Sequence, residues 1–177
     1  MNTAGRRVLA SVGDFGVIVG WLAGLTAVSV VVRTAVRGTA GDGPDIWDSR
    51  DAPPAAVDLG VFLLTVLPVG AYLTATEAGP HQASAGKRRQ GLRVTTTGGA
   101  RPGPRRVLAR NALKLLPWQL GHLSATRFAT GREPSPAVWA AYGLALVLAA
   151  ADVAAALRDP HGRALHDRLT GTRVTPT

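Results

Sequence analysis

Residues 15–32 read FGVIVGWLAGLTAVSVVV, a run of 18 residues without one charged side chain. At about 1.5 Å per residue, a helix of this length approaches the thickness of the hydrocarbon core of a bilayer, which is about 30 Å. If one carboxylate, Asp14, is admitted, the apolar stretch extends back to residue 8. The sequence therefore predicts a membrane-spanning helix over residues 8–32.

Two further runs have the same character. Residues 59–76 and residues 134–151 each hold 18 consecutive uncharged residues. Long uncharged apolar runs are the main sequence signal of transmembrane helices. They predict spans over about residues 57–76 and 135–157.

A shorter uncharged run, residues 115–126, is a fourth candidate. It holds only 12 residues, and polar or helix-breaking residues interrupt it: Pro117, Gln119 and His122. Its length suits a re-entrant or interfacial segment. It also suits a span over about residues 113–128 whose flanking basic side chains extend toward water.

The distribution of basic residues separates these alternatives. The chain carries 20 Lys and Arg against 11 Asp and Glu, a formal net charge of +9. With four spans, 15 of the 20 basic residues share the side of the N-terminus, the loop 79–112 with the adjoining Lys114, and the tail 158–177. An excess of Lys and Arg marks the cytoplasmic side. We therefore predict an all-α, polytopic cell-membrane protein with one membrane domain over residues 1–177 and both termini in the cytoplasm.

Several kinds of chemistry are excluded or disfavoured. The chain has no cysteine, which excludes disulfides, thiolate nucleophiles and cysteine metal ligands. It also lacks the common hydrolase, nucleotide-binding and zinc-protease motifs. We therefore expect no enzyme, no cofactor and no metal site.

The loop 79–112 is strongly basic and holds no Phe, Trp or Tyr. Its charge predicts attraction to anionic lipid headgroups. Nucleic acid is not an expected partner, because proteins that bind single strands stack bases on aromatic side chains. Residues 92–97 favour a short strand ahead of a turn rich in glycine and proline, as a short β-hairpin would have.

Asp14, His122 and Asp152 are candidates for an ion pathway, because a charge in hydrocarbon costs several kcal/mol unless it is paired or hydrated. Helical rise from the flanking basic residues places each aspartate about 10 Å inside the cytoplasmic boundary, and His122 about 12 Å inside it. The three side chains would then share one depth. The competing interpretation is that Arg110 or Lys114 neutralises Asp14, while Asp152 lies at the membrane interface.

Small residues recur four apart in the first and last predicted spans. They are Gly16, Gly20 and Gly24 in the first span, and Ala137, Ala141, Ala145 and Ala149 in the last. Such spacing allows close approach of helices and predicts a contact between these two spans. Chance spacing explains it equally well, because glycine and alanine are frequent throughout the chain.

Eight residues in three separated blocks form one further pattern. They are Arg7 and Asp14; Gly86, Lys87, Gly91, Arg93 and Arg110; and Asp167. In this order around the predicted spans, the blocks resemble the RDD family of bacterial integral membrane proteins, which is named for one arginine and two aspartates. Those three correspond here to Arg7, Asp14 and Asp167. Ser84-Ala85 departs from the Thr-Pro that the family commonly has before Gly-Lys.

The resemblance implies a helical membrane protein in which transport is suspected, with cation/proton exchange one proposal. Two hypotheses follow: an oligomeric transporter with Asp14 as the titrating carboxylate, and a non-transporting scaffold or assembly factor that binds another membrane protein. We also expect the cytoplasmic blocks to fold back as a cap against the first helix, where Arg7 or the Lys87–Arg93 cluster would neutralise Asp167.

Overall fold

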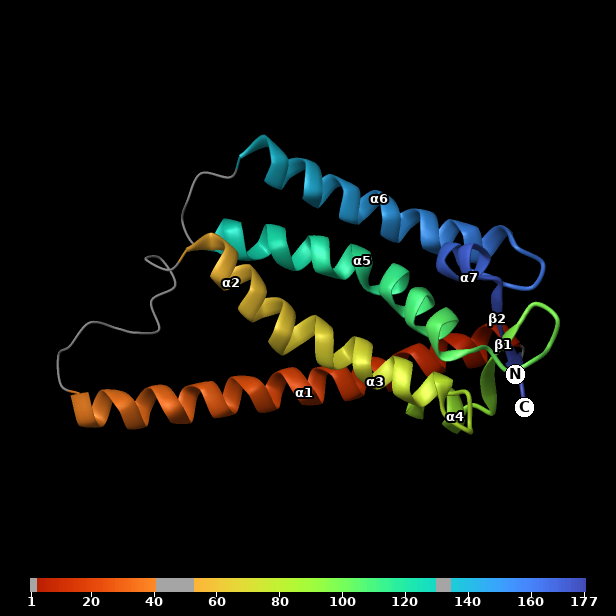
Figure 1. Ribbon diagram of the computed structural model, residues 1–177, viewed down its shortest axis with the longest axis horizontal. Helices are drawn as coiled ribbons and strands as arrows, with labels where there is room; N and C mark the ends of the chain where they lie inside the picture. Colours follow the sequence, from red (N-terminus) through yellow and green to blue (C-terminus); the bar gives the residue numbers. More distant parts are fainter. Residues whose placement is uncertain (1–2, 41–52, 130–134) are drawn as a thin grey trace.

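The computed structural model describes residues 3–40, 53–129 and 135–177. In this part of the chain, four long helical segments run back and forth between two ends of the molecule (Figure 1). They are α1 (Thr3–Ala40), the continuous segment α2 (Pro54–Val61), η1 (Phe62–Val66) and α3 (Leu67–Ala78), then α5 (Pro104–Ala129) and α6 (Pro136–Arg158). Proline begins α2, α5 and α6, at a helix position where its missing amide hydrogen has no consequence.

The second segment changes its winding just before a proline. η1 is a π-helical turn that ends two residues before Pro68. Pro68 has no amide hydrogen to donate to the carbonyl of Leu64, four residues earlier. The indole Nε1–H of Trp21 on α1 donates to that carbonyl instead, at 2.9 Å. One side chain thus satisfies a backbone acceptor inside an apolar segment.

A small cap closes the end that holds both termini (Figure 1). It consists of α4 (Ala85–Arg89), β1 (Leu92–Thr96), α7 (Leu165–Thr170) and β2 (Thr172–Pro176). The strand predicted at residues 92–97 is confirmed, but the hairpin is wrong. β1 pairs antiparallel with the C-terminal β2, with Val94 opposite Val174. Buried Leu92 and Val94 give this pairing its apolar contact.

The cap rests on α1 through a contact between main chains. A Cβ atom on Gly86 of α4 would lie 2.1 Å from the carbonyl oxygen of Ala10, so only glycine fits there. Gly13 of α1 faces Gly86, and a Cβ atom on Gly13 would lie 3.1 Å from the Cα atom of Gly86. The expected fold-back of the cytoplasmic blocks onto the first helix is therefore present.

The contact predicted between the first and last spans is wrong. α6 packs along α5, and α5 also packs against α3. Among the described residues, no atom lies within 4 Å of a Cβ built on Gly16, Gly20 or Gly24. Small-residue spacing permits a close helix contact but does not specify the partner.

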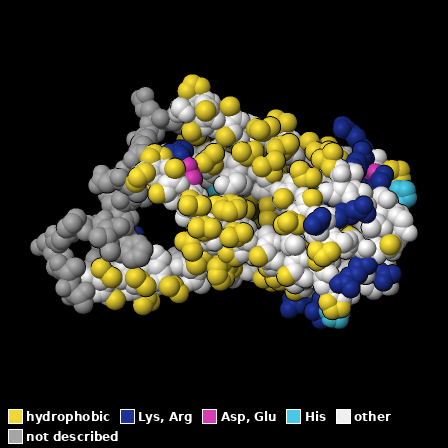
Figure 2. Space-filling model, in the orientation of Figure 1, with side chains coloured by type: hydrophobic (Ala, Val, Ile, Leu, Met, Phe, Trp, Pro, Cys, Tyr) yellow, Lys and Arg dark blue, Asp and Glu magenta, His cyan; other side chains and the backbone are white. Residues whose placement is uncertain are grey.

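Three helical segments within the described residues are long and apolar enough to cross a membrane: Gly5–Val36, Pro54–Ala78 and Pro136–Arg158. α5 is less apolar, but it is one continuous helix of 26 residues, about 39 Å long, that passes through Pro117. Hydrophobic side chains cover the body of the molecule, and most visible Lys and Arg side chains gather at the cap end (Figure 2). This is the surface of a polytopic helical membrane protein.

Truncation of a cap side chain tests the packing of β1. Leu92→Ala should lower the free energy of unfolding by about 2–5 kcal/mol, because it removes a fully buried side chain and leaves a cavity. Leu169→Ala, at an exposed cap position, is the matched control and should cost less than about 0.5 kcal/mol. Unfolding in detergent measures both. Equal losses would show that β1 is not packed as described.

Candidate functional site

Five ionisable side chains from five helices meet where the cap joins the long helices. We call them the charge network: Asp14 on α1, Glu77 on α3, Lys87 on α4, Arg110 on α5 and Asp167 on α7. All five are buried, and Glu77 has no exposed surface at all. Burial of this many charges requires that each one be paired.

The charges alternate along one continuous chain of ion pairs. Lys87 Nζ lies 3.5 Å from Asp14 Oδ2 and 2.8 Å from Glu77 Oε1. Arg110 Nη1 lies 2.8 Å from Glu77 Oε2, and Arg110 Nε lies 2.8 Å from Asp167 Oδ1. Glu77 is thus the central member, with one cation on each carboxylate oxygen.

Neutral donors complete the coordination of the two terminal carboxylates. Asp14 accepts hydrogen bonds from the Ser84 hydroxyl at 2.5 Å and from the Gly86 amide at 2.8 Å. Asp167 accepts one from the Thr172 hydroxyl at 2.8 Å. The close packing of Gly86 on α1 is what brings its amide within reach of Asp14.

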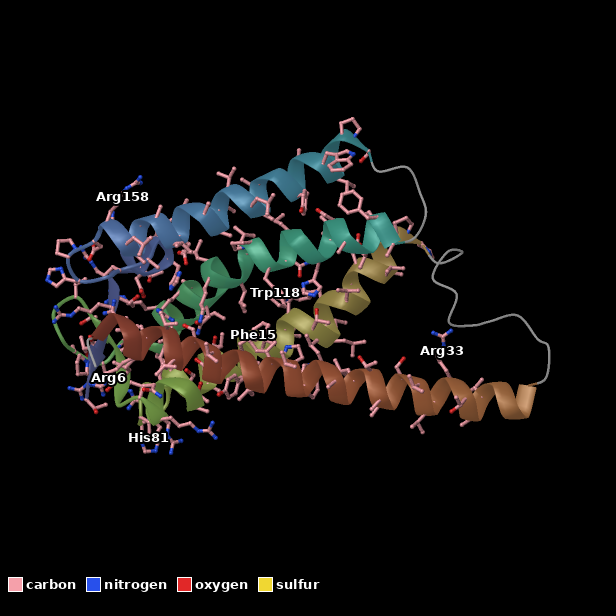
Figure 3. The ribbon with its side chains drawn as sticks, turned by 180° about the vertical axis from the view of Figure 1, so that it is seen from behind. Arg6, Phe15, Arg33, His81, Trp118 and Arg158 are labelled. Atoms are coloured by element: carbon pink, nitrogen blue, oxygen red, sulfur yellow. The ribbon has the colours of Figure 1, made fainter. Side chains whose placement is uncertain are left out.

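Arg7 has a different role from the one expected. Its Nη1 donates to the Gly162 carbonyl at 2.8 Å, and its Nη2 donates to the Val174 carbonyl. Arg6 beside it, labelled at the cap end of α1 in Figure 3, donates through Nε to the Gln90 carbonyl at 2.7 Å. The two arginines therefore fasten the start of α1 to the main chain of the cap, and Arg110 is the ion-pair partner of Asp167.

The remaining motif residues lie around β1. Gly91 adopts φ +57°, a left-handed conformation that favours glycine, and its carbonyl accepts hydrogen bonds from Arg6 and from the Thr177 amide. Arg93 follows in β1 and is exposed. Neither residue belongs to the charge network.

The structure separates the three residues proposed for an ion pathway. Asp14 lies in the charge network, paired with Lys87 and not with Arg110 or Lys114. Asp152 on α6 contacts His166 Nδ1 at 2.8 Å, and His166 Nε2 lies 3.7 Å from Asp167, so Asp152 lies beyond the opposite end of the charge network from Asp14. His122 lies twelve residues beyond Arg110 on α5, about 18 Å along the helix. Helical rise places residues along one axis, but it does not determine which helices are neighbours.

Glu77 was missed from the sequence, although a signal was present. It directly follows the uncharged run 59–76, and it is the only acidic residue between Leu59 and Arg132. A single carboxylate among many basic residues is a strong candidate for a buried ion pair. Ser84 and Thr172 carry no comparable signal, because hydroxyl residues are common in loops.

Oxygen atoms surround the Lys87 ammonium. Glu77 Oε1 lies 2.8 Å from Nζ, Ser84 Oγ 3.2 Å and Asp14 Oδ2 3.5 Å. In the described part of the chain, no group of three or more His, Asp and Glu has the arrangement of a metal site. The oxygen set around Lys87 is therefore a place where one positive charge is held by two carboxylates and a hydroxyl.

The pKa of Asp167 is lowered from its ordinary value. Burial alone would raise this pKa, but the positive charge of Arg110 and the charge on His166 outweigh it, together with hydrogen bonds from Arg110 and Thr172. A carboxylate with a lowered pKa in the folded protein stabilises the fold above its unfolded pKa of about 3.9, and the stabilisation disappears as pH falls through the folded value.

Replacing Arg110 tests the charge network. Arg110→Met should cost about 3–5 kcal/mol of unfolding free energy, because it leaves Glu77 and Asp167 without one cation each. Arg168→Met is the control: this exposed side chain pairs with Asp159 at 3.3 Å and should contribute less than about 1 kcal/mol. If both variants unfold alike in detergent, the network is not the main ionic contact.

The lowered pKa of Asp167 predicts a pH dependence. At pH 7 wild type should be more thermostable than Asp167→Asn, and the difference should shrink below about pH 4, where the unfolded carboxyl takes up its proton. Melting temperatures of both proteins from pH 7 to pH 3 measure this. A difference that stays constant over the whole range would contradict the pairing of Asp167.

Comparison with known proteins agrees with the pattern of these residues. The RDD family model matches residues 1–171. Comparisons with curated proteins and with solved structures gave no match. The match extends over nearly the whole chain, from the start of α1 through α7. The chain therefore belongs to the RDD family and is an integral membrane protein.

Proposed function

We propose that the protein is a cell-membrane transporter that exchanges a small cation for a proton at the charge network. The observation that carries the proposal is the oxygen set around Lys87, formed by Glu77, Ser84 and Asp14. Carboxylate and hydroxyl oxygens are the ligands that hard cations use in proteins. The Lys87 ammonium therefore occupies a position that a small monovalent cation could also occupy.

The exchange conserves charge. If a small monovalent cation takes the place of the Lys87 ammonium in the oxygen set, the charge held by Asp14 and Glu77 stays the same. We expect Asp14 to separate from Lys87 before Glu77 does, because the contact of Asp14 with Lys87 is longer, at 3.5 Å, than the 2.8 Å contact of Glu77. Glu77 retains Arg110 as a partner throughout.

The cost of the network supports a function beyond stability. Buried ion pairs often stabilise a fold no better than well-packed apolar side chains of the same volume. Ionisable groups at membrane helices commonly belong to ion or proton pathways. Five such groups joined in one chain therefore favour a role in moving charge.

The orientation proposed for the protein follows from its basic residues. The N-terminus, the C-terminus and the cap lie at one end of the molecule (Figure 1), and 15 of the 20 Lys and Arg belong to that side. We assign this end to the cytoplasm and α5 to a fourth span beside α3 and α6. Four spans enclose little space, so a transporter of this size is expected to assemble as a homo-oligomer.

A scaffold that binds another membrane protein is the second candidate. The observation that favours it is the glycine face of α1, at Gly16, Gly20 and Gly24, which has no neighbour among the described residues. Glycine faces of this kind bring membrane helices into close contact. Neither candidate is an enzyme.

Flux measurements on reconstituted protein test the transport proposal. Wild type in proteoliposomes should move protons against a monovalent cation, and Asp14→Asn should reduce the flux at least tenfold while it remains folded. Asp58→Asn is the matched control, because its ion pair with Arg127 lies on α2 and α5, outside the charge network. Its flux should equal that of wild type.

Two results would reject exchange at the charge network. One is normal flux in folded Asp14→Asn, which would exclude the oxygen set as the exchange site. The other is absence of flux in well-folded wild type, and co-purification with one stoichiometric membrane partner would then support the scaffold.

A further inference from the structure

A second site lies beside the charge network, in a groove between the segment η1–α3 and helix α5. The groove has a volume of about 560 Å³, within the range of small-ligand sites. Its lining is almost entirely apolar and includes Phe62, Leu67, Leu108 and Leu115. Nothing in the charge network occupies this groove.

The groove opens sideways, toward the surrounding membrane. Leu108 and Leu116 line it and are 58% and 41% exposed, so its rim is not closed by protein. One wall runs from Phe62 to Ala75, about 20 Å along a segment that is apolar enough to span the bilayer. Half of a bilayer's hydrocarbon core is about 15 Å thick, so the groove is long enough for one acyl chain.

Three polar side chains line the groove: Thr74 and Asn111 contact each other, whereas Oε1 of Gln119 is buried without a hydrogen-bond partner among the described residues. Asn111 Nδ2 lies 3.4 Å from Thr74 Oγ1, and Asn111 Oδ1 lies 3.4 Å from Arg110 Nη1. These contacts turn the amide of Asn111 toward protein partners. An apolar chain therefore fits along the groove without leaving these two polar groups unpaired.

Two arginines stand at the end of the groove next to the cap. Arg105 lies one helical turn before Leu108, on the face of α5 that lines the groove at positions 108, 112, 115 and 119. Arg101 donates to the Ala78 carbonyl at the end of α3, one turn beyond Ala75 of the opposite wall. Each wall is thus followed by an arginine on the cap side of the groove, where basic residues would attract anionic lipid headgroups.

We propose that this groove is a binding site for an anionic phospholipid, with one acyl chain between α3 and α5 and its phosphate at Arg101 and Arg105. The apolar lining selects a chain and the two arginines select a negative headgroup. Basic residues near anionic headgroups each add attraction. The site does not depend on cation exchange at the charge network.

Lipid binding by purified, delipidated protein tests the site. Native mass spectrometry with added phosphatidylglycerol or phosphatidylcholine should show one bound lipid with roughly tenfold preference for phosphatidylglycerol in wild type. The double variant Arg101→Gln/Arg105→Gln should lose this preference. The double variant Arg88→Gln/Arg89→Gln removes the same charge from exposed positions of α4 and should keep the preference.

A second variant tests the acyl-chain part of the site. Gly70 lines the groove, and a Cβ there would already lie 3.4 Å from Leu115 Cδ1, so Gly70→Leu should fill the groove and reduce binding of both lipids at least tenfold. Equal binding of the two lipids by wild type would overturn the assignment of the headgroup. Undiminished binding by Gly70→Leu, or displacement of lipid by inorganic phosphate alone, would overturn the acyl-chain site.

Discussion

The bond pattern of Arg110 is the constraint on which the cap end of the molecule depends. One buried guanidinium binds Glu77 at the end of α3 and Asp167 in α7, and Glu77 in turn binds Lys87, which reaches Asp14. Each carboxylate is buried with its partner, so loss of any one cation leaves a negative charge where water cannot solvate it. The network therefore specifies which elements meet at this end.

Much of the fold could be predicted from the sequence, because long uncharged runs indicate membrane spans and basic loops indicate which loops share one side of the bilayer. The three apolar spans and the strand in the basic loop follow from such local patterns, and the fold-back of the cap onto α1 was expected from the blocks that resemble the RDD family. The pairing of β1 with β2 could not be predicted, because an alternating strand does not indicate its partner. The contacts between helices could not be predicted either, because apolar residues that face lipid and apolar residues that face protein look alike in a sequence.

At the candidate site, too, important residues could be identified from the sequence, but the residues that pair with them could not. The sequence identifies Asp14 and Asp167 as important, but the partners expected for them are wrong, because the chain holds many basic residues and the sequence does not show that Lys87 and Arg110 pack against these aspartates. Glu77 joins them and was overlooked. An ion pair between distant segments depends on the packing of the helices that carry it, and residue spacing along one helix does not contain that information.

The charge network and the apolar groove share one wall. Arg110 belongs to the network, and the next residue, Asn111, lines the groove. A lipid in the groove would therefore contact the helix that supplies Arg110 to the charge network. The proposed charge movement and the proposed lipid binding are expected to influence each other through α5, because both would act on the position of this helix.

The most direct test of the central claim is a double-mutant cycle between Asp14→Asn and Asp167→Asn. Within the described residues, these two carboxylates have no common ion-pair partner, and the ion pairs that link them run through Lys87, Glu77 and Arg110. A continuous network predicts a coupling of more than about 0.5 kcal/mol in the free energy of unfolding, whereas Asp14→Asn and Asp58→Asn should be additive. Additivity of Asp14→Asn and Asp167→Asn within about 0.3 kcal/mol would contradict the claim that the five charges act as one unit.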